Sequence, residues 1–176
     1  MSAKKPSSQQ IWGIVEKMGT KIALVNEHSQ LQEAIVTYLP QLLSLLSFPD
    51  TTVRNKVVEV LTHINKRVRQ DESIKLPLLK ILDLYLSPTD NPFVKNFSNV
   101  YVEMAFQRSS HEEKATVLPT LLKGISTKVE PQQGTLLRHM LEGILYTKIP
   151  QTEEECLEKF ASIKEENNDL KALLHF

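Results

Sequence analysis

The stretch LPQLL at residues 39–43 recurs as LPLL at residues 76–79 and as LPTLL at residues 118–122. The prolines of the three copies lie 37 and then 42 residues apart. The turn SFPD, residues 47–50, follows the first copy, and SPTD, residues 87–90, follows the second. A period near 40 residues is typical of HEAT and armadillo arrays, in which each repeat is a pair of helices.

Apolar residues recur at helical spacing around these copies, and no useful segment alternates with a period of two. Asp50 and Thr51 are candidate caps for one helix, and Asn91-Pro92 is a candidate entry to another. Pro40 lies inside its stripe, so a kink or a break is expected there. The stripes predict helices over about residues 31–46, 53–68, 74–86, 93–104, 110–124 and 136–145, with a shorter helix around residues 11–18.

The same stripes predict which side chains face the core. They include Tyr38 in the first stripe and Leu79 in the third. The last two stripes are Phe93, Phe97, Val100, Tyr101 and Met104, and then Leu136, Leu137, Met140, Leu141, Ile144 and Leu145.

The expected fold is all-α, an α-solenoid of about three HEAT/armadillo-like helical hairpins. Stacking is required because one helix pair cannot bury its apolar stripe alone. An N-terminal helix and a C-terminal capping helix are expected at the two ends. The predicted organisation is a disordered N-terminus over residues 1–8, the solenoid over residues 9–148, and a short linker with a terminal helix over residues 149–176.

A polar ladder is predicted along the stack. In HEAT repeats, the turn aspartate and a basic residue of the second helix often bond from one repeat to the next. Asp50, Arg54, Asp90 and Lys95 match those positions. The third repeat, after Gly124, has neither an aspartate nor a Val-Arg pair.

Composition excludes several classes of function. Lysine plus arginine and aspartate plus glutamate each number 21, so the formal net charge is zero, which argues against general nucleic-acid binding and anionic membranes. The single cysteine, Cys156, cannot form an internal disulfide and suits a reducing compartment. No signal peptide or membrane-spanning run is visible, so a soluble intracellular protein is expected.

No catalytic, metal or cofactor site is predicted. The five histidines are scattered singly, and His111-Glu112-Glu113 lacks the second histidine of a zinc-protease helix. Glutamates around Cys156 would raise the pKa of its thiol, the opposite of nucleophile activation. No phosphate-binding glycine loop or nucleophile elbow occurs. A helical enzyme or nucleic-acid binder is therefore the least favoured class.

The densest basic cluster is formed by Lys66, Arg67 and Arg69, with Lys56 and Lys75 nearby. These cations complement the dipole at a helix C-terminus next to a solvated loop, which is the favoured interpretation. The alternatives are contacts of Lys56, Lys66, Arg67 and Arg69 with an acidic protein partner or with nucleic acid. No aromatic residues interleave with them to stack bases.

Two further features have open interpretations. Trp12 either packs a first helix onto the stack as a cap or, if exposed, anchors an interface. Residues 152–155 fit a capping box, and the apolar residues Leu157, Phe160, Ile163, Leu170 and Leu174 follow at helical spacing. The tail is either a terminal cap, which is favoured, or a partner helix of coiled-coil type.

Several segments, taken in order, resemble a known family. They are VRNKVVEVLTHINKR at 53–67, IKLP at 74–77, FVKNF at 93–97 with VYVEM at 100–104, and LPTLL at 118–122 followed by PQQ at 131–133. These segments resemble the N-terminal region of the large HEAT-repeat proteasome adaptor and scaffold family. The resemblance spans about residues 31–146.

The resemblance implies a non-enzymatic adaptor that binds the proteasome core and regulatory particles and supports their assembly, stability or localisation. It implies a cytoplasmic and nuclear protein, with peripheral placement at endosomal or endoplasmic reticulum membranes through partners. The alternative hypothesis is a generic HEAT-repeat module of another complex, in trafficking or nuclear transport.

Overall fold

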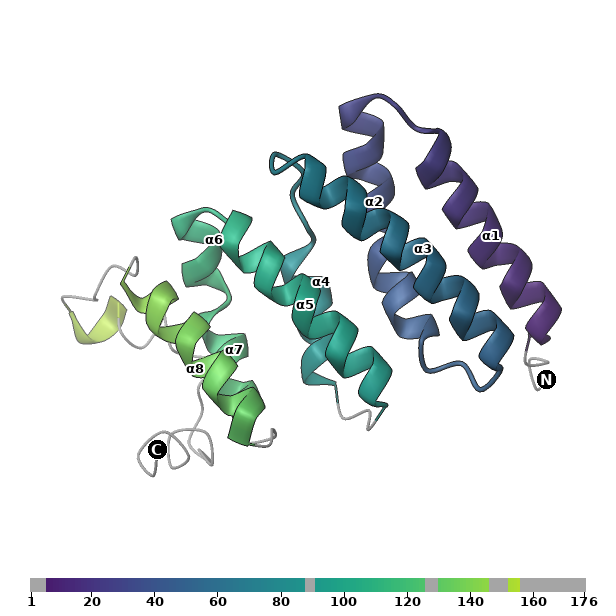
Figure 1. The fold of residues 1–176 in the computed structure, drawn as a ribbon. Helices are drawn as coiled ribbons and strands as arrows, with labels where there is room; N and C mark the ends of the chain where they lie inside the picture. The colour runs from purple at the N-terminus through teal and green to yellow at the C-terminus, as the bar shows by residue number, and fades with distance from the viewer. Residues whose placement is uncertain (1–5, 88–90, 126–129, 146–151, 156–176) are drawn as a thin grey trace. The chain divides into compact units, whose positions relative to one another are not determined.

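The computed structural model describes residues 6–87, 91–125, 130–145 and 152–155, and these residues contain helices and no strand. The all-α prediction is confirmed. The chain divides into two compact units, Met1–Arg108 and Ser109–Phe176. The helices are α1 Ser8–Leu24, α2 His28–Leu45, α3 Thr51–Gln70, α4 Leu78–Leu86 and α5 Pro92–Arg108 in the first unit, and α6 His111–Thr116, α7 Leu118–Ile125 and α8 Glu130–Ile144 in the second (Figure 1).

In the first unit, α1, α3 and α5 form one layer and run in the same direction, while α2 and α4 lie behind them (Figure 1). Helices α2 and α3 form one hairpin, and α4 and α5 form the next. Helix α1 packs on both α2 and α3. The apolar side chains between the layers are fully buried, with Ile35, Leu42, Val57 and Ile64 at 0% exposure. This arrangement is the helical-hairpin repeat that the sequence predicts.

Equivalent residues of the two hairpins lie 41 residues apart. Asp50 caps α3 by accepting from the amides of Thr52 and Val53, at 2.8 and 3.3 Å. Asn91, 41 residues later, caps α5 by accepting from the second and third amides of that helix, at 3.0 and 3.4 Å. Both side chains satisfy amides that have no partner inside the helix. The expected caps at Asp50 and Asn91-Pro92 are therefore confirmed.

Helix α2 continues through Pro40 from His28 to Leu45, so the expected break does not occur. Proline cannot donate the amide bond to the residue four positions earlier. Leu39, Leu42 and Leu43 flank it and are all fully buried. Packing on both sides of the proline therefore compensates for the missing hydrogen bond.

Two of the predicted helices have different bounds in the structure. Helix α4 begins at Leu78 and not near Ile74, because the Gln32 side chain bonds both the amide and the carbonyl of Lys75, each at 2.6 Å. These two backbone groups are then unavailable to a helix. The single helix expected over residues 110–124 is divided into α6 and α7 at Val117, two residues before Pro119, which has no amide hydrogen.

The predicted core stripes of α2, α4, α5 and α8 are too wide. Leu79, Phe93, Val100, Leu141, Ile144 and Leu145 are exposed, and Tyr38, Phe97, Met104 and Leu137 are partly buried. Helix α5 instead buries Val94, Ser98, Tyr101, Val102, Ala105 and Phe106. An apolar residue at helical spacing shows that a helix is amphipathic, but the neighbouring helices decide which of its sides is covered.

Helix α1 begins at Ser8 with Ser7 as its cap, one residue before the predicted start of the solenoid. The Thr152 hydroxyl accepts from the Glu155 amide at 3.2 Å, as the capping-box pattern predicts. The remainder of the predicted terminal helix, with Cys156 and the apolar residues after it, lies outside the described residues.

Candidate protein-binding groove

The four predicted partner contacts all lie on α3, but they have different roles. Arg67 is half-buried and donates to the carbonyls of Ile22 and Val25 at the end of α1, the latter at 2.7 Å. These carbonyls belong to the last turn, where no amide of the same helix can reach them. Lys66 and Arg69 are exposed. Arg67 therefore links α3 to the end of α1, and its contact with a partner stays a prediction.

Arg108 repeats the role of Arg67 one hairpin later. Its guanidinium donates to the carbonyls of Val68, Asp71 and Ile74 at 2.8, 3.2 and 3.0 Å, closing the end of α3. Arg67 and Arg108 are 41 residues apart, the same spacing as the two caps. Each arginine thus covers the C-terminal carbonyls of the preceding helix in the layer. This pair is not among the residues predicted from the sequence, although the shared spacing of two arginines at helix ends is a signal for it.

The predicted ladder between Asp50, Arg54, Asp90 and Lys95 stays a prediction, because Asp90 lies outside the described residues. Arg54 donates to the carbonyls of Phe48 and Pro49, at 2.9 and 2.7 Å, within its own turn. Lys95 is the residue of α5 that corresponds to Arg54, 41 positions later. Hydrogen bonds from the Ser8 hydroxyl and then the Val53 and Thr52 amides lower the pKa of Asp50.

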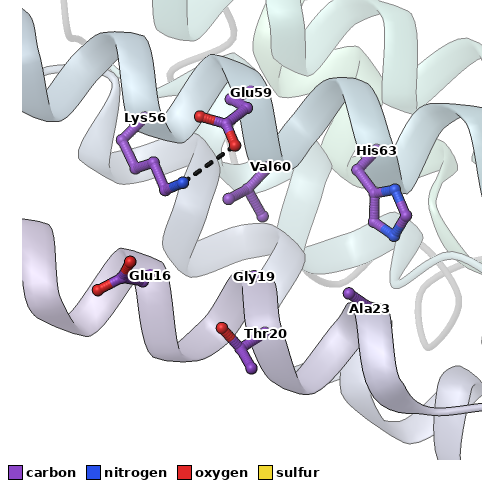
Figure 2. Close-up of a pocket in the computed structure, with 8 residues that line it drawn as sticks. All are labelled: Glu16, Gly19, Thr20, Ala23, Lys56, Glu59, Val60 and His63. Atoms are coloured by element: carbon purple, nitrogen blue, oxygen red, sulfur yellow. Dashed lines mark hydrogen bonds and ion pairs between the residues drawn. The ribbon is translucent and has the colours of Figure 1, made fainter.

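A groove of about 420 Å³ lies between α1 and α3 (Figure 2). Glu16, Gly19, Thr20 and Ala23 line it from α1, and Lys56, Glu59, Val60 and His63 line it from α3. Figure 2 shows Val60 pointing toward Gly19, where the two helices come closest. A Cβ atom at residue 19 would stand 2.8 Å from a methyl group of Val60. Gly19, Thr20 and Ala23 of α1 have small side chains or none, so the space between the two helices stays open beside this contact.

The charges of the groove are unevenly paired. The Lys56 ammonium lies 3.0 Å from a Glu59 carboxylate oxygen and 5.8 Å from the centre of the Trp12 ring. Lys56 is thus already engaged on two sides, although it is one of the predicted partner contacts. Trp12 is half-buried in α1, which packs on α2 and α3, as the cap interpretation predicts. The described residues offer the Glu16 carboxylate neither a hydrogen bond nor an ion pair.

A second groove, of about 450 Å³, lies between α1 and α2 and is lined by Lys21, Leu24, Val25, Gln30, Glu33, Ala34, Thr37 and Tyr38. The Lys21 ammonium donates to the Tyr38 hydroxyl at 3.2 Å and lies 5.8 Å from the centre of the same ring. The α1/α2 groove is lined by one glutamate and one lysine, whereas the α1/α3 groove is lined by two glutamates and one lysine. Counting only lysine and glutamate, the formal charges are therefore zero for the α1/α2 groove and minus one for the α1/α3 groove.

A cluster of His28, Asp71 and Ser73 ties the start of α2 to the loop after α3. His28 Nε2 lies 2.9 Å from Ser73 Oγ and 3.5 Å from Asp71 Oδ2. A serine–histidine–aspartate relay needs the serine and the carboxylate on different ring nitrogens. Here one nitrogen meets both groups, and the Ser73 hydroxyl itself donates to Asp71. The cluster is a structural link that lowers the pKa of Asp71, chiefly through the Ser73 hydroxyl.

In the second unit, Lys114 of α6 is 7% exposed and pairs with Glu142 of α8. Gly143 of α8 lies against α6 and the start of α7: a Cβ atom there would stand 2.8 Å from Leu118 Cδ2 and 3.1 Å from the Lys114 carbonyl oxygen. Beyond this contact, Leu141, Ile144 and Leu145 are exposed at the end of α8.

Within the described ranges, no three side chains of histidine, cysteine, aspartate or glutamate gather to form a metal site. No helix in the described part of the chain combines the length and the hydropathy that a membrane span requires.

The stacked hairpins, their 41-residue spacing and their open grooves define a helical repeat protein of the HEAT type, a class whose extended surfaces bind other proteins. The model of the family described as "Proteasome component ECM29, N-terminal" matches residues 15–176, and the chain belongs to this family.

Three curated relatives carry related names. The chain is 31% identical over 175 residues to the human "Proteasome adapter and scaffold protein ECM29", covering 99% of this chain and 9% of the relative. It is 29% identical to the Drosophila melanogaster "Proteasome-associated protein ECM29 homolog", covering 78% of this chain and 7% of the relative. Identity to the Saccharomyces cerevisiae "Proteasome component ECM29" is 23%, over 89% of this chain and 9% of the relative. The chain thus spans less than a tenth of these relatives, and no solved structure matches it.

Proposed function

We propose that this chain is a non-enzymatic, protein-binding adaptor that associates with the proteasome. The observation that carries the proposal is the family match over residues 15–176, together with relatives that are named as proteasome adapters and proteasome components. The HEAT-type fold supports a binding role, because stacked helices present a long surface without needing a catalytic cavity.

The partners proposed are subunits of both the core particle and the regulatory particle, so that binding supports the assembly, stability or localisation of the complete complex. The chain would work in the cytoplasm and nucleus, and any association with endosomal or endoplasmic reticulum membranes would be peripheral and made through partners. The α1/α3 groove and the exposed end of α8 are the surfaces of the described residues that suit such contacts.

The test is a binding experiment with purified particles. The tagged chain is immobilised and offered core particle, regulatory particle, or both, and retained subunits are identified by mass spectrometry. We expect retention of both particles, with subunits recovered in their native ratios. The double variant Leu61→Asp/Leu121→Asp, which places a charge in the core of each unit, serves as the control for non-specific capture. Failure to retain either particle, or recovery of one unrelated complex from lysate in their place, would refute the proposal.

A further inference from the structure

The α1/α3 groove is short, and its length limits what it can hold. On each helix the lining residues span eight positions, which are seven steps along the chain, from Glu16 to Ala23 and from Lys56 to His63. At 1.5 Å per residue this corresponds to about 10 Å along the helix axes. An extended peptide advances about 3.3 Å per residue, so the groove is long enough for about three residues. Its volume of about 420 Å³ suits a few side chains and not a whole helix.

The chemistry of the lining differs between its centre and its edges. Near the middle are Gly19 and Val60, which is 5% exposed, and Ala23 lies at the end opposite Glu16; these three residues give the groove its apolar part. At the edges, Lys56 is neutralised by Glu59, whereas the Glu16 carboxylate is exposed and unpaired among the described residues. The charge left over in the groove is therefore negative. A ligand that places a cation beside Glu16 and small apolar groups over Val60 complements both parts.

We infer that the α1/α3 groove binds a short extended segment of a partner protein in which a lysine or arginine adjoins small apolar residues. The basic side chain pairs with Glu16 at one end of the groove, and the apolar residues on one side of it extend over Val60 and Gly19 toward Ala23. The inference deepens the proposed adaptor function by naming the chemistry that this surface recognises. The α1/α2 groove lacks the same preference because its formal charges cancel.

Two pairs of variants separate the grooves. Glu16→Lys reverses the unpaired charge of the α1/α3 groove, and Glu33→Lys makes the same change on an exposed glutamate of the other groove. Thr20→Trp fills the α1/α3 groove, and Thr37→Trp adds the same bulk beside α2. All four positions are exposed, so the fold should tolerate each change.

The probes are three capped pentapeptides, Ala-Leu-Lys-Leu-Ala and the same peptide with glutamate or glutamine at the centre. Binding to the isotope-labelled full chain is followed through the amide shifts of Gly19, Thr20, Ala23, Val60 and His63. We expect saturable shifts with the lysine peptide, weaker ones with the glutamine peptide and none with the glutamate peptide. The Glu16→Lys variant should bind the lysine peptide with about tenfold lower affinity, since the change replaces attraction between the two charges by repulsion.

Thr20→Trp should abolish the shifts, while Glu33→Lys and Thr37→Trp should bind as the wild type does. Equal shifts from the lysine and glutamate peptides, shifts centred on the α1/α2 groove, or normal binding by Glu16→Lys would each overturn the inference. Should Thr20→Trp lose its helical circular dichroism, the Glu16→Lys comparison decides alone.

A second readout separates this inference from the proposed function. Proteasome particles are offered to the wild type and to Glu16→Lys. Equal capture by both proteins would refute the groove as the contact and leave the adaptor function standing. No capture by the wild type, combined with selective binding of the lysine peptide, would refute the proteasome function and support the groove.

Discussion

The first unit holds its helices together differently from the second. In the first unit, Arg67 and Arg108 reach from one helix of the layer to the last carbonyls of the preceding one. In the second unit, an ion pair between the buried Lys114 and the partly exposed Glu142, together with a close backbone contact at Gly143, links α8 to α6 and α7. The first unit also has a close glycine contact, at Gly19, but there the nearest atoms belong to the Val60 side chain, whereas at Gly143 they include a backbone carbonyl oxygen. The same helical repeat can therefore be fixed by recurring polar links or by close packing.

The largest expected effect is the loss of one unit's core. Leu61 is 1% exposed in α3, and Leu121 is fully buried in α7. Leu61→Asp places an unpaired charge between helices, at a cost on the order of 4 kcal/mol or more. Hydrogen exchange should show protection lost across α1 to α5, and Leu121→Asp should remove it across α6 to α8. Wild-type helicity and melting temperature in Leu61→Asp would contradict the core assignment.

Removal of the arginine links should have the next largest effect. Arg108→Met leaves the terminal carbonyls of α3 without their donor, and we expect the free energy of unfolding to fall by about 2 kcal/mol. Arg67→Met should cost a comparable amount at the end of α1. Urea unfolding measures both changes. The matched controls are Lys66→Met and Arg69→Met, exposed cations of the same helix, which should change stability by less than about 0.5 kcal/mol. Equal effects at all four positions would show that the links are unimportant.

Alanine substitutions at glycine positions test how much the close contacts between helices contribute to stability in each unit. Gly143→Ala drives a methyl group against Leu118 and a backbone carbonyl, and should cost roughly 1–3 kcal/mol. Gly19→Ala meets a Val60 methyl group and no backbone atom, so its cost should be smaller. Gly13 and Gly134 have nothing within 4 Å of the new Cβ, and alanine there should stabilise the helix by about 0.5–1 kcal/mol. Thermal unfolding gives the order, and a stabilising Gly143→Ala would remove the contrast between the units.

The smallest expected effect is the loss of stability at low pH that results from protonation of Asp50. The Ser8 hydroxyl and the helix amides lower the pKa of Asp50 below its ordinary value of 3.8. Its ionised form therefore stabilises the fold above that value, and the contribution is lost as the pH falls through the lowered pKa. An asparagine at this position can still cap the helix but does not titrate. The free energy of unfolding of Asp50→Asn should therefore fall less than that of the wild type between about pH 6 and about pH 3. Asp83→Asn, at an exposed position of α4, is the control, and urea midpoints at the two pH values are the measurement.

The helices, their caps and their repetition were predictable because they depend on residues close together in the sequence. Asp50 and Asn91 signal helix starts through their own side chains, and leucines at helical spacing signal amphipathic helices. The all-α fold and the family resemblance followed from such patterns. The exposed side chains Phe93, Val100 and Leu141 show the limit of this reasoning, since their spacing suits a core that the neighbouring helices do not provide.

By itself, the sequence determined that the chain folds into paired helices with a period near 41 residues, because turn chemistry and apolar spacing act locally. Only the tertiary structure decided what each charge meets. Arg67 belonged to a basic cluster in the sequence, yet it lies against the carbonyls of residues more than 40 positions away, while Glu16 is left unpaired beside an open groove. Such pairings depend on which helices stack and how closely, and that distance is set at Gly19 and Val60 by contacts between segments far apart in the chain.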